Sequence, residues 1–597
     1  MEQRPPTWRA LGWLAGAALS TSACAGATAP GPAPNPPHPR VASASALPKT
    51  NAAGGRCKPA PDRPKLVIAV APRPTPQPHV HVRIDVEAAP TALTHWVLAD
   101  AATVRTDGIK VSDAGGALPV DVSPVGGELR MRLTRSPCGP VRVEYDVATV
   151  GDLSMKPLAL VVGADHLRAT GESLLLLPTA LDETVTSVSL SIDGESIYAS
   201  ATASSFGVGA VKDRLLRGRA LRHASFLAGQ LGTAVFRGLE GDDDAAWIGY
   251  TAFDPRSAAA EVAMLRSAFK AFFGDRQPSP FALLIVSDPR AKGAVSSTPR
   301  SQSVLLHAGV EQTWNARVRL AVAQRLVQQW IGGQLWIGPV DAAHEGESYW
   351  FTQGVARHFA AVLALRTQVL DPDDYRDEIV GQLSTAYGSP YRGSSNVELA
   401  RQAKRPGAVA LLTARGALYA ARVSELMRGL SRGKRTLDPV VLELLERARR
   451  EGGVLPTTVW VEAMRRELGS AEAAAFERLI GAGAEPTLPK AALGPCYVPV
   501  PARYPVFDPG FDLERTLASE SRRVVGLRRD GPAHRAGLRE GDVVRDARLD
   551  PDRPEASAEL SVERAGSSLT LRYLPSGTRT GQGWKRKPGM DDAQCRD

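Results

Sequence analysis

Long apolar runs, closely spaced cysteines and dense basic stretches are scarce in this chain, and each scarcity excludes a class of protein. After residue 19, no stretch approaches the ~20 apolar residues that a membrane-spanning helix needs. No two of the 5 cysteines form a Cys-x-x-Cys pair, which argues against a thiolate zinc site. The one dense basic run is 585–587, and a net charge of +9 is small for 597 residues. A nucleic-acid partner is therefore not expected.

The first 24 residues have the three-part layout of an export signal. Two arginines precede an apolar run over 10–19, and small residues then lead to Cys24. This layout resembles a bacterial lipoprotein signal, in which Cys24 would be the lipidated residue. Ordinary cleavage near Ala23 or Ala25 is the alternative. We expect an exported protein of the bacterial cell envelope, anchored to a membrane by lipid and facing the periplasm or the exterior.

Four further cysteines could form disulfides, because an exported protein meets an oxidising compartment. Four cysteines allow three pairings. Cys57–Cys138 and Cys496–Cys595 would each join neighbouring segments of the chain. Free buried thiols are the alternative that the sequence leaves open.

The residues after the signal read as a spacer followed by a β-rich domain. Residues 25–63 are rich in Pro and Ala, a composition that favours extended conformations over a packed core. Residues 64–215 alternate apolar and polar residues between Gly, Pro and Asp, which predicts a β-sandwich-like domain. The expected strands cover 65–71, 79–87, 129–133, 141–147 and 187–192.

The pattern changes at residue 216 to that of an α+β domain extending to residue 485. An amphipathic helix is predicted over 258–273, and apolar strands over 281–286 and 303–307. The whole chain is therefore predicted to be a multidomain α+β protein whose middle domain is mainly helical. The predicted helices cover 314–331, 349–368, 372–386, 407–430, 437–451 and 457–468.

A third folded domain is predicted over 495–575, followed by a disordered tail over 576–597. Its main signal is Pro-Ala-x-x-Ala-Gly-Leu-x-x-Gly-Asp, starting at Pro532, which resembles the helix, turn and strand of a PDZ domain. The residues expected to pack inward or to form the turns are Ala533, Ala536, Gly537, Leu538, Gly541 and Asp542.

Gly510, Phe511, Asp512 and Leu513 form the candidate carboxylate-binding loop of this PDZ-like domain. Their backbone N–H groups would face the C-terminal carboxylate of a peptide, which would add to the domain as a strand. The expected partners are therefore peptides or protein C-termini. A domain that only packs on its neighbour is the alternative.

The helix predicted over 314–331 carries two amides at the spacing of metal ligands. Gln324 and Gln328 lie four residues apart and share a face. Neutral amide oxygens are poor substitutes for the usual zinc ligands. Arg325 does not lose its proton at useful pH and cannot act as a general base. We interpret the amides as a buried, hydrogen-bonded pair. A displaced metal site would have to use His344, Glu345, Glu347 and His358.

Two segments downstream of this helix add to the pattern. Residues 349–354 read Tyr-Trp-Phe-Thr-Gln-Gly, and 387–392 read Tyr-Gly-Ser-Pro-Tyr-Arg. Together with the helix over 314–331, they resemble the bacterial glycyl aminopeptidase family of zinc peptidases. The resemblance implies a β-rich N-terminal domain, a thermolysin-like or aminopeptidase-like catalytic domain and a C-terminal PDZ domain. It is strongest over 314–450.

The resemblance places the catalytic positions of the family on residues of different chemistry. Its two histidine ligands and its general base fall on Gln324, Gln328 and Arg325. Its glutamate ligand falls on Gln353, and the position of a tyrosine falls on Thr413. The glycine-rich substrate segment falls near Lys292–Val295, where no glutamate is found. Zinc is expected of the family, but its ligands are absent, so no cofactor is predicted here.

We therefore expect a pseudopeptidase, an inactive descendant that binds peptide or protein segments without hydrolysis. Two alternatives remain open at this stage. One is an active metallopeptidase with atypical ligands, and the other is a purely structural protein of the cell envelope.

Overall fold

The structure is a computed structural model of the whole chain. It describes residues 57–595 apart from 58, 101–103, 105, 150–159, 239–240, 289–294, 342 and 552–555. The expected export signal with Cys24, and most of the 25–63 spacer, lie outside the described residues. Among the described residues, no helix combines the length and the apolar character needed to cross a bilayer. Helices and several sheets are both present, which confirms the predicted α+β class.

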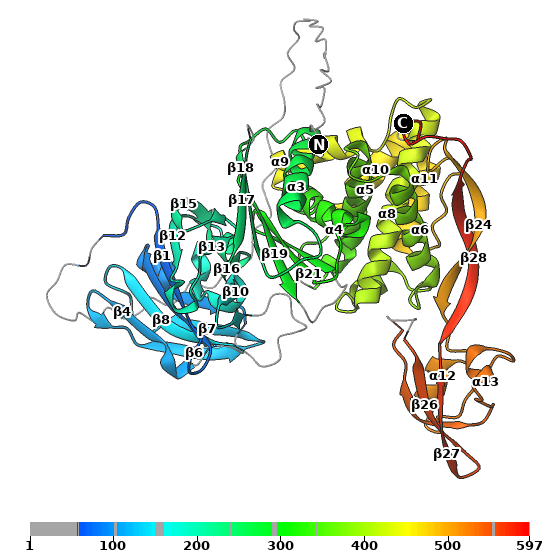
Figure 1. Cartoon of the computed structure of the whole chain (residues 1–597), viewed down its shortest axis with the longest axis horizontal. Helices are drawn as coiled ribbons and strands as arrows, with labels where there is room; N and C mark the ends of the chain where they lie inside the picture. The colour runs from blue at the N-terminus through cyan, green and yellow to red at the C-terminus, as the bar shows by residue number, and fades with distance from the viewer. Residues whose placement is uncertain are drawn as a thin grey trace, which may run out of the picture. The chain divides into compact units, whose positions relative to one another are not determined.

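Two sheets lie in the N-terminal part of the chain, and several of their strands are labelled in Figure 1. Residues of both contribute to one hydrophobic core. One sheet has the strand order β15-β12-β1-β2-β8-β4-β5, and the other has the order β11-β3-β7-β6. In β2 (His79–Glu87) every second residue is buried, because successive side chains of a strand point to opposite faces. The other strands are β1 (Lys65–Arg73), β3 (His95–Leu98), β4 (Lys110–Asp113), β5 (Gly116–Ala117), β6 (Val120–Val125), β7 (Glu128–Leu133), β8 (Val141–Ala148), β11 (Leu177–Pro178), β12 (Val185–Ile192) and β15 (Val211–Arg217).

All the strands expected from alternation in this part are present, with ends displaced by at most two residues. A third sheet, of order β14-β13-β16-β10-β9, was not predicted. Its strands are short, so they leave little alternation for a sequence pattern to show. They are β9 (Val161–Val162), β10 (His166–Thr170), β13 (Ala201–Ser204), β14 (Gly207–Val208) and β16 (Ser225–Gly229).

A five-stranded sheet of order β17-β18-β19-β21-β20 supports the predicted site. β18 (Gly241–Ile248), β19 (Phe281–Asp288) and β21 (Ser303–Gly309) are parallel, and β17 (Gly232–Gly238) and β20 (Val295–Arg300) pair antiparallel at the edges. β19 is buried on both faces, as is usual for a covered parallel sheet. Its core is shared with α3 (Pro255–Phe272) and with the helices that follow.

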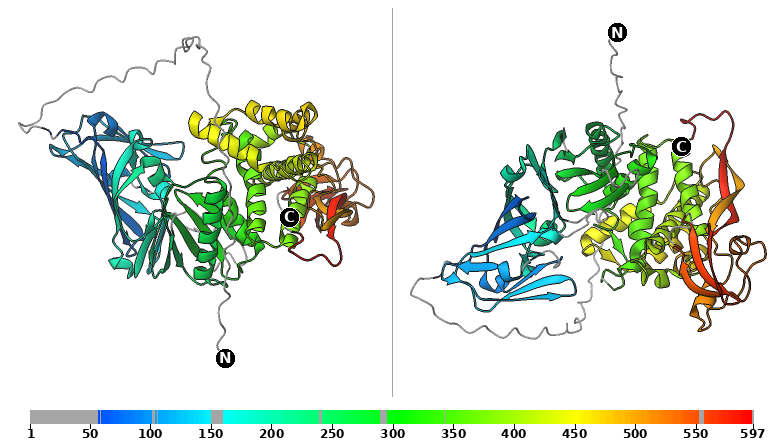
Figure 2. Two further views of the ribbon diagram at one scale, coloured as in Figure 1. Left: turned by 90° about the horizontal axis from the view of Figure 1, so that it is seen from above. Right: turned by 60° about the horizontal axis from the view of Figure 1, so that its bottom comes forward.

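All the helical stretches predicted after residue 314 are confirmed. Figure 2 shows these helices from two further sides. They are α4 (Ala316–Val327), the π-helix η7 (Trp350–Val355) continued by α5 (Ala356–Arg366), α6 (Pro372–Gly388), α8 (Pro406–Leu430), α9 (Asp438–Glu451) and α10 (Thr457–Leu468). Shorter turns are α7 (Asn396–Ala400), α11 (Ser470–Phe476) and η8 (Glu477–Gly481).

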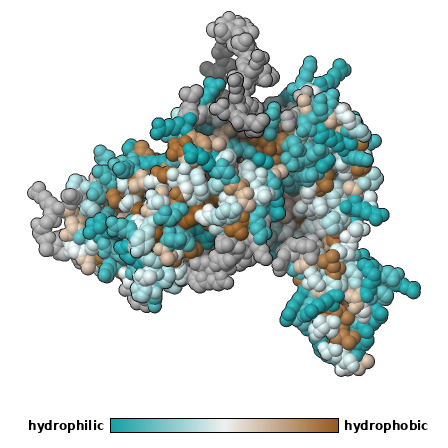
Figure 3. All heavy atoms as spheres, in the orientation of Figure 1, coloured by the Kyte–Doolittle hydropathy of each residue, from teal (hydrophilic) through white to brown (hydrophobic). Residues whose placement is uncertain are grey.

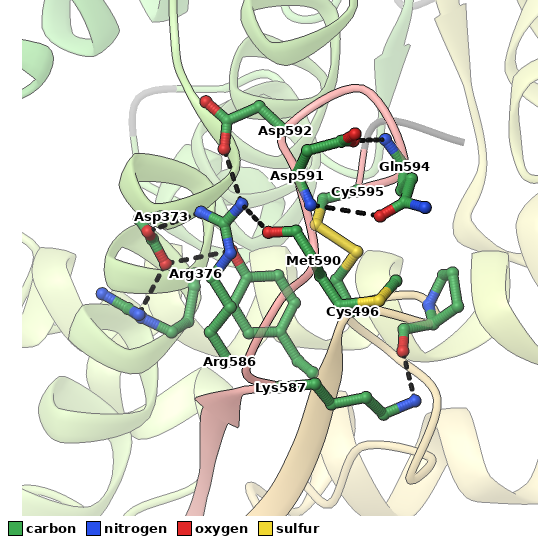
Figure 4. The surroundings of a disulfide bond; sticks show 12 residues. Asp373, Arg376, Cys496, Arg586, Lys587, Met590, Asp591, Asp592, Gln594 and Cys595 are labelled. Carbon is green, nitrogen blue, oxygen red and sulfur yellow. Dashed lines mark hydrogen bonds and ion pairs between the residues drawn. A yellow bond between two sulfur atoms is a disulfide. The ribbon is translucent and has the colours of Figure 1, made fainter.

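The expectation of a disordered tail after residue 576 is wrong. β28 (Ser576–Arg586) pairs antiparallel with the whole of β24 (Tyr497–Phe507). Arg586 then forms ion pairs with Asp373 of α6 at 2.9 Å and with Asp592 at 2.7 Å, beside a disulfide (Figure 4). The tail is polar in composition, but its contacts with β24 and α6 order it. These partners lie far earlier in the chain, so the sequence of the tail alone does not reveal them.

Both disulfides that would join neighbouring segments are present. Cys57 is bonded to Cys138, and Cys496 is bonded to Cys595. They span 81 and 99 residues of sequence, so each closes a long loop. On the face drawn in Figure 3, hydrophilic and intermediate residues cover most of the surface, with hydrophobic residues between them.

A small unit lies between β24 and β28 in the sequence. It contains α12 (Leu513–Ala518), α13 (Pro532–Arg535) and a sheet of β25 (Val543–Arg548), β26 (Ala558–Arg564) and β27 (Ser567–Tyr573). Ala533 and Leu538 are fully buried in its core, as predicted, and Ala536 is half-buried. Gly537 and Gly541 have φ of +101° and +85°, which suits the turns expected there. Asp542 fixes the turn by accepting the Arg539 N–H at 2.8 Å.

Candidate functional site

The helix α4 carries most of the predicted site, and its cap and apolar face hold it in place. The Asn315 side chain accepts a hydrogen bond from the Val318 N–H at 3.2 Å, which caps the helix. Gln324 lies on the buried face with 7% exposure, and Arg325 is half-buried. At the other end, the Gln328 N–H closes the last turn on the Gln324 carbonyl at 3.0 Å. The remaining buried residues of α4 are Val318, Leu320, Val322, Ala323, Leu326 and Val327.

Gln353 lies on η7, a single π-helical turn that precedes α5. Such turns are rare in proteins overall, but those that occur often lie at functional sites. Trp350 and Phe351 of η7 pack edge-on against Trp460, with ring centroids 5.4 and 5.6 Å away. Gly354 lies against the backbone of α8, so η7 approaches that helix closely. These contacts fix Gln353 opposite the end of α4.

The structure brings Gln324, Arg325, Gln328 and Gln353 together in one hydrogen-bonded group. Gln328 Nε2 donates to Gln353 Oε1 at 2.8 Å and to the Thr352 carbonyl at 2.9 Å. Gln324 Nε2 donates to the Gln353 carbonyl at 3.2 Å. Arg325 Nη1 donates to Gln328 Oε1 at 2.7 Å and to Gln353 Oε1 at 3.4 Å. Each of the three side-chain amides therefore has at least one protein partner, as is usual for polar groups away from solvent.

Arg357 completes this group and was not predicted. Its Nη1 donates to Gln324 Oε1 at 3.1 Å. Its Nε and Nη2 each donate to the carboxylate of Glu378 on α6 at 2.7 Å. The signal that could have found it is spacing, because Arg357 follows Gln353 by four residues in a helical stretch. We call Gln324, Arg325, Gln328, Gln353 and Arg357 the amide–guanidinium cluster.

The amide–guanidinium cluster carries two cations, and among the described residues only Arg357 has a carboxylate partner. Burial, and to a lesser degree the charge of Arg357, lowers the pKa of Arg325 to about 10. Arg325 therefore stays charged at neutral pH and cannot act as a general base. Its Nε donates to the Ser297 carbonyl at 2.9 Å, which ties α4 to β20. Two partly buried positive charges oppose the binding of a divalent cation beside them.

The donor set of the amide–guanidinium cluster does not fit a zinc ion. Zinc in proteins is held by imidazole, thiolate or carboxylate groups. Here the side-chain oxygens of Gln324, Gln328 and Gln353 each already accept a hydrogen bond from an amide or a guanidinium. Within the described residues, no group of three or more His, Cys, Asp or Glu is placed to hold a metal.

Two of the four residues considered for a displaced metal site, His344 and Glu345, have other contacts. His344 Nδ1 lies 2.7 Å from Asp341 Oδ1 on the surface. Glu345 accepts a hydrogen bond from the Tyr349 hydroxyl at 3.0 Å. His358 is 6% exposed, and its burial lowers its pKa to about 4, so its imidazole is neutral at pH 7.

In the described part of the chain, neither Thr413 nor the glycine-rich segment contributes a side chain to the amide–guanidinium cluster. The Thr413 hydroxyl donates to the Val409 carbonyl of its own helix at 2.9 Å. Of the segment Lys292–Val295, the first three residues lie outside the described part of the chain, and Val295 opens β20.

The loop Gly510–Leu513 uses part of its backbone internally. The Gly510 N–H donates to Asp508 Oδ1 at 2.9 Å, and the Asp512 N–H donates to the Val525 carbonyl at 3.0 Å. At most the amides of Phe511 and Leu513 could then face a ligand.

Comparison by sequence finds no relative: no protein-family model matches the chain, and no curated protein matches it significantly. The fold matches an aminopeptidase N family protein from Idiomarina loihiensis with a TM-score of 0.64 and 15% identity, over 89% of this chain and 99% of that one. An M1 zinc metallopeptidase from Deinococcus radiodurans matches with a TM-score of 0.47 and 16% identity, over 72% and 97% of the two chains. The first match shows that this chain shares the fold of that aminopeptidase N family protein.

Proposed function

We propose that this protein is a pseudopeptidase, which keeps an aminopeptidase-like scaffold and binds peptide or protein segments without hydrolysing them. The observation that carries the proposal is the guanidinium of Arg325, which donates to Gln328 Oε1 at 2.7 Å and to Gln353 Oε1 at 3.4 Å. A metal-dependent hydrolase needs a Lewis acid and a group that takes a proton from water. The amide–guanidinium cluster offers a permanent cation and neutral amides instead. The motifs at 349–354 and 387–392 support descent from a glycyl aminopeptidase-like enzyme.

The test of this proposal is hydrolysis by the full chain. We expect no turnover of aminoacyl-p-nitroanilides, glycine included, with or without added zinc. The matched control is the Arg325→Gln variant, whose background rate should equal that of the wild type. Zinc-dependent turnover by the wild type that EDTA abolishes would overturn the proposal and favour a metallopeptidase with atypical ligands.

We also propose that the small unit containing α12 and α13 contributes a PDZ-like peptide contact through the amides of Phe511 and Leu513. Leu513 is the first residue of α12, where proline is tolerated and removes an N–H group. Leu513→Pro should weaken the binding of peptides with a free C-terminus, and Leu513→Ala should not. Equal binding by both variants and the wild type would contradict this role.

The proposed location is the bacterial cell envelope, with a lipid on Cys24 as the membrane anchor. Its support is the layout of the first 24 residues. In a bacterial host, Cys24→Ser should move the protein from the membrane fraction to the soluble fraction. A wild-type protein that is already soluble would contradict the anchor.

A further inference from the structure

Arg325 keeps one edge of its guanidinium without a protein partner in the described part of the chain. Its Nε donates to Ser297, and its Nη1 donates to Gln328 and Gln353. No described residue accepts a hydrogen bond from Nη2. Nη2 is not one of the side-chain atoms that are both without a hydrogen-bond partner and fully enclosed by protein. Nη2 therefore keeps some contact with solvent and has no described protein partner.

Three arginines of the chain that are better shielded from solvent have more complete sets of hydrogen-bond and ion-pair partners. Arg266 pairs with Asp243 at 2.5 Å, and Arg300 pairs with Glu172. Arg415 has no carboxylate partner among the residues that the structure describes, but its two Nη atoms donate to four oxygens at 2.8 to 2.9 Å. Those four oxygens belong to Ser394, Asn396, Arg392 and Gly483. Arg325 has neither a carboxylate nor a full set of oxygens.

The charge balance around Arg325 also calls for an anion. Among the described residues, Glu378 is the acid that accepts hydrogen bonds from the amide–guanidinium cluster. Both of its carboxylate oxygens accept from Arg357. Two guanidinium groups and one carboxylate leave one positive charge. Burial lowers the pKa of Arg325, and no acid raises it. An uncompensated charge in such surroundings costs stability, and a bound anion would remove that cost.

We propose that the Nη2 edge of Arg325 binds a carboxylate of the peptide ligand. The place that would hold a metal cation in a zinc peptidase would then select an acid. Guanidinium groups recognise carboxylates through planar, charge-assisted hydrogen bonds. One net positive charge matches a singly charged carboxylate better than a phosphate, whose charge at pH 7 lies between one and two. The carboxylate could come from a peptide C-terminus or from an acidic side chain. This inference rests on the proposed function, because it assumes that the ligand is a peptide.

The test follows the Arg325 Nε–H signal by NMR in the full chain, with the signal assigned by its loss in Arg325→Gln. The probes are tri-alanine, tri-alanine amide, acetate and inorganic phosphate. We expect a saturable shift with acetate and with tri-alanine, and at least about tenfold weaker binding of the amide. Acetyl-Ala-Asp-Ala amide then separates the two sources, because it carries a side-chain carboxylate but no free C-terminus.

Two further variants serve as controls. One tests whether the planar geometry of the guanidinium matters, and the other tests whether removing any arginine from α4 has the same effect. Arg325→Lys keeps the charge without the planar fork, so it should weaken tri-alanine binding in calorimetry; it also serves if Arg325→Gln does not fold. Arg319→Gln removes an arginine of the same helix that pairs with Glu261 at 2.9 Å, and it should bind like the wild type.

Three results would overturn the inference: no saturable shift below about 10 mM carboxylate, equal binding of tri-alanine and its amide, or tighter binding of phosphate. A carboxylate preference that survives in both Arg325 variants when Leu513 is also changed to Pro would place recognition elsewhere and would overturn it as well. The proposed function fails separately. A zinc-dependent hydrolytic activity would contradict the pseudopeptidase, whereas an inactive protein without carboxylate preference would contradict only this inference.

Discussion

Gly416 of α8 and Trp350 of η7 meet backbone to backbone. A Cβ added to Gly416 would lie 1.8 Å from the Trp350 carbonyl oxygen, and one added to Gly354 would lie 2.6 Å from the Gly416 Cα. Neither distance is possible for real atoms, so only glycine fits at this crossing. The contact sets the separation of α8 and η7, and through η7 it sets the place of Gln353.

The crossing predicts a large effect for a small change. Gly416→Ala should destabilise the fold by roughly 3 kcal/mol or prevent folding, because the backbone has to move to accept one methyl group. The matched control is Gly381→Ala in α6, where no atom lies within 4 Å of the added Cβ. That change should stabilise the protein by about 0.5 kcal/mol, since alanine favours a helix. Denaturant unfolding measures both, and equal effects would contradict the tight crossing.

The Arg357–Glu378 pair should contribute strongly to stability because it is mostly shielded, with side-chain exposures of 17% and 12%. Glu378→Gln would leave both cations of the amide–guanidinium cluster without a carboxylate. We expect a loss of roughly 3 kcal/mol in the free energy of unfolding. The exposed pair Arg466–Glu443 provides the control, and Glu443→Gln should cost less than about 1 kcal/mol. A similarly small effect of Glu378→Gln would contradict the prediction, because it would mean that the two cations of the amide–guanidinium cluster do not need the carboxylate for stability.

Acid stability should depend on Glu172. Burial by itself would raise the pKa of this carboxyl, but hydrogen bonds from His223 and Arg300 outweigh it and lower the pKa to about 2. A depressed folded-state pKa stabilises the protein above the usual value of 4.5, and the stabilisation is lost as the pH falls from 4.5 towards 2. The difference corresponds to about 3 kcal/mol.

Unfolding free energies measured between pH 2 and pH 7 test this dependence. Glu172→Gln should flatten the slope between pH 4.5 and 2. Glu183→Gln changes an exposed carboxylate that pairs with Arg219, and it should keep the wild-type slope. Identical slopes in all three proteins would contradict the role of Glu172.

The disulfide Cys496–Cys595 should hold the end of the chain on β24. It closes a loop of sequence separation 99, for which a chain-entropy argument gives roughly 4–5 kcal/mol. The double variant Cys496→Ser, Cys595→Ser should unfold at a lower temperature and exchange the amides of β28 faster. The amides of β2, in the other half of the chain, serve as the internal reference. Unchanged protection of β28 would mean that strand pairing alone fixes the tail.

The sequence predicts those elements whose signal is local. Alternation locates β2 and helical periodicity locates α10 to the residue, because each pattern lies within one element. β18 escapes prediction because Asp242, Asp243 and Asp244 are disfavoured in strands. β24 contains Pro499, Pro501 and Pro505, which weaken a strand signal, and its partner β28 lies about 80 residues later.

The site divides in the same way. Gln324, Arg325, Gln328 and Gln353 stand out because their spacing repeats that of a metal motif. Arg357 and Glu378 do not, since their pairing depends on how α5 and α6 pack together. The close contact of Gly354 with Gly416 likewise depends on the distance between two backbones that are far apart in sequence.

The most direct test of the account is zinc bound per chain after equilibrium dialysis, measured by mass spectrometry. The wild type is compared with the variant Gln324→His, Arg325→Glu, Gln328→His, Gln353→Glu, which restores imidazole and carboxylate ligands on the same helices. The account predicts less than about 0.1 zinc per wild-type chain and about one zinc per chain of the variant. One zinc per wild-type chain, lost on changing Gln324 and Gln328 to Ala, would contradict it.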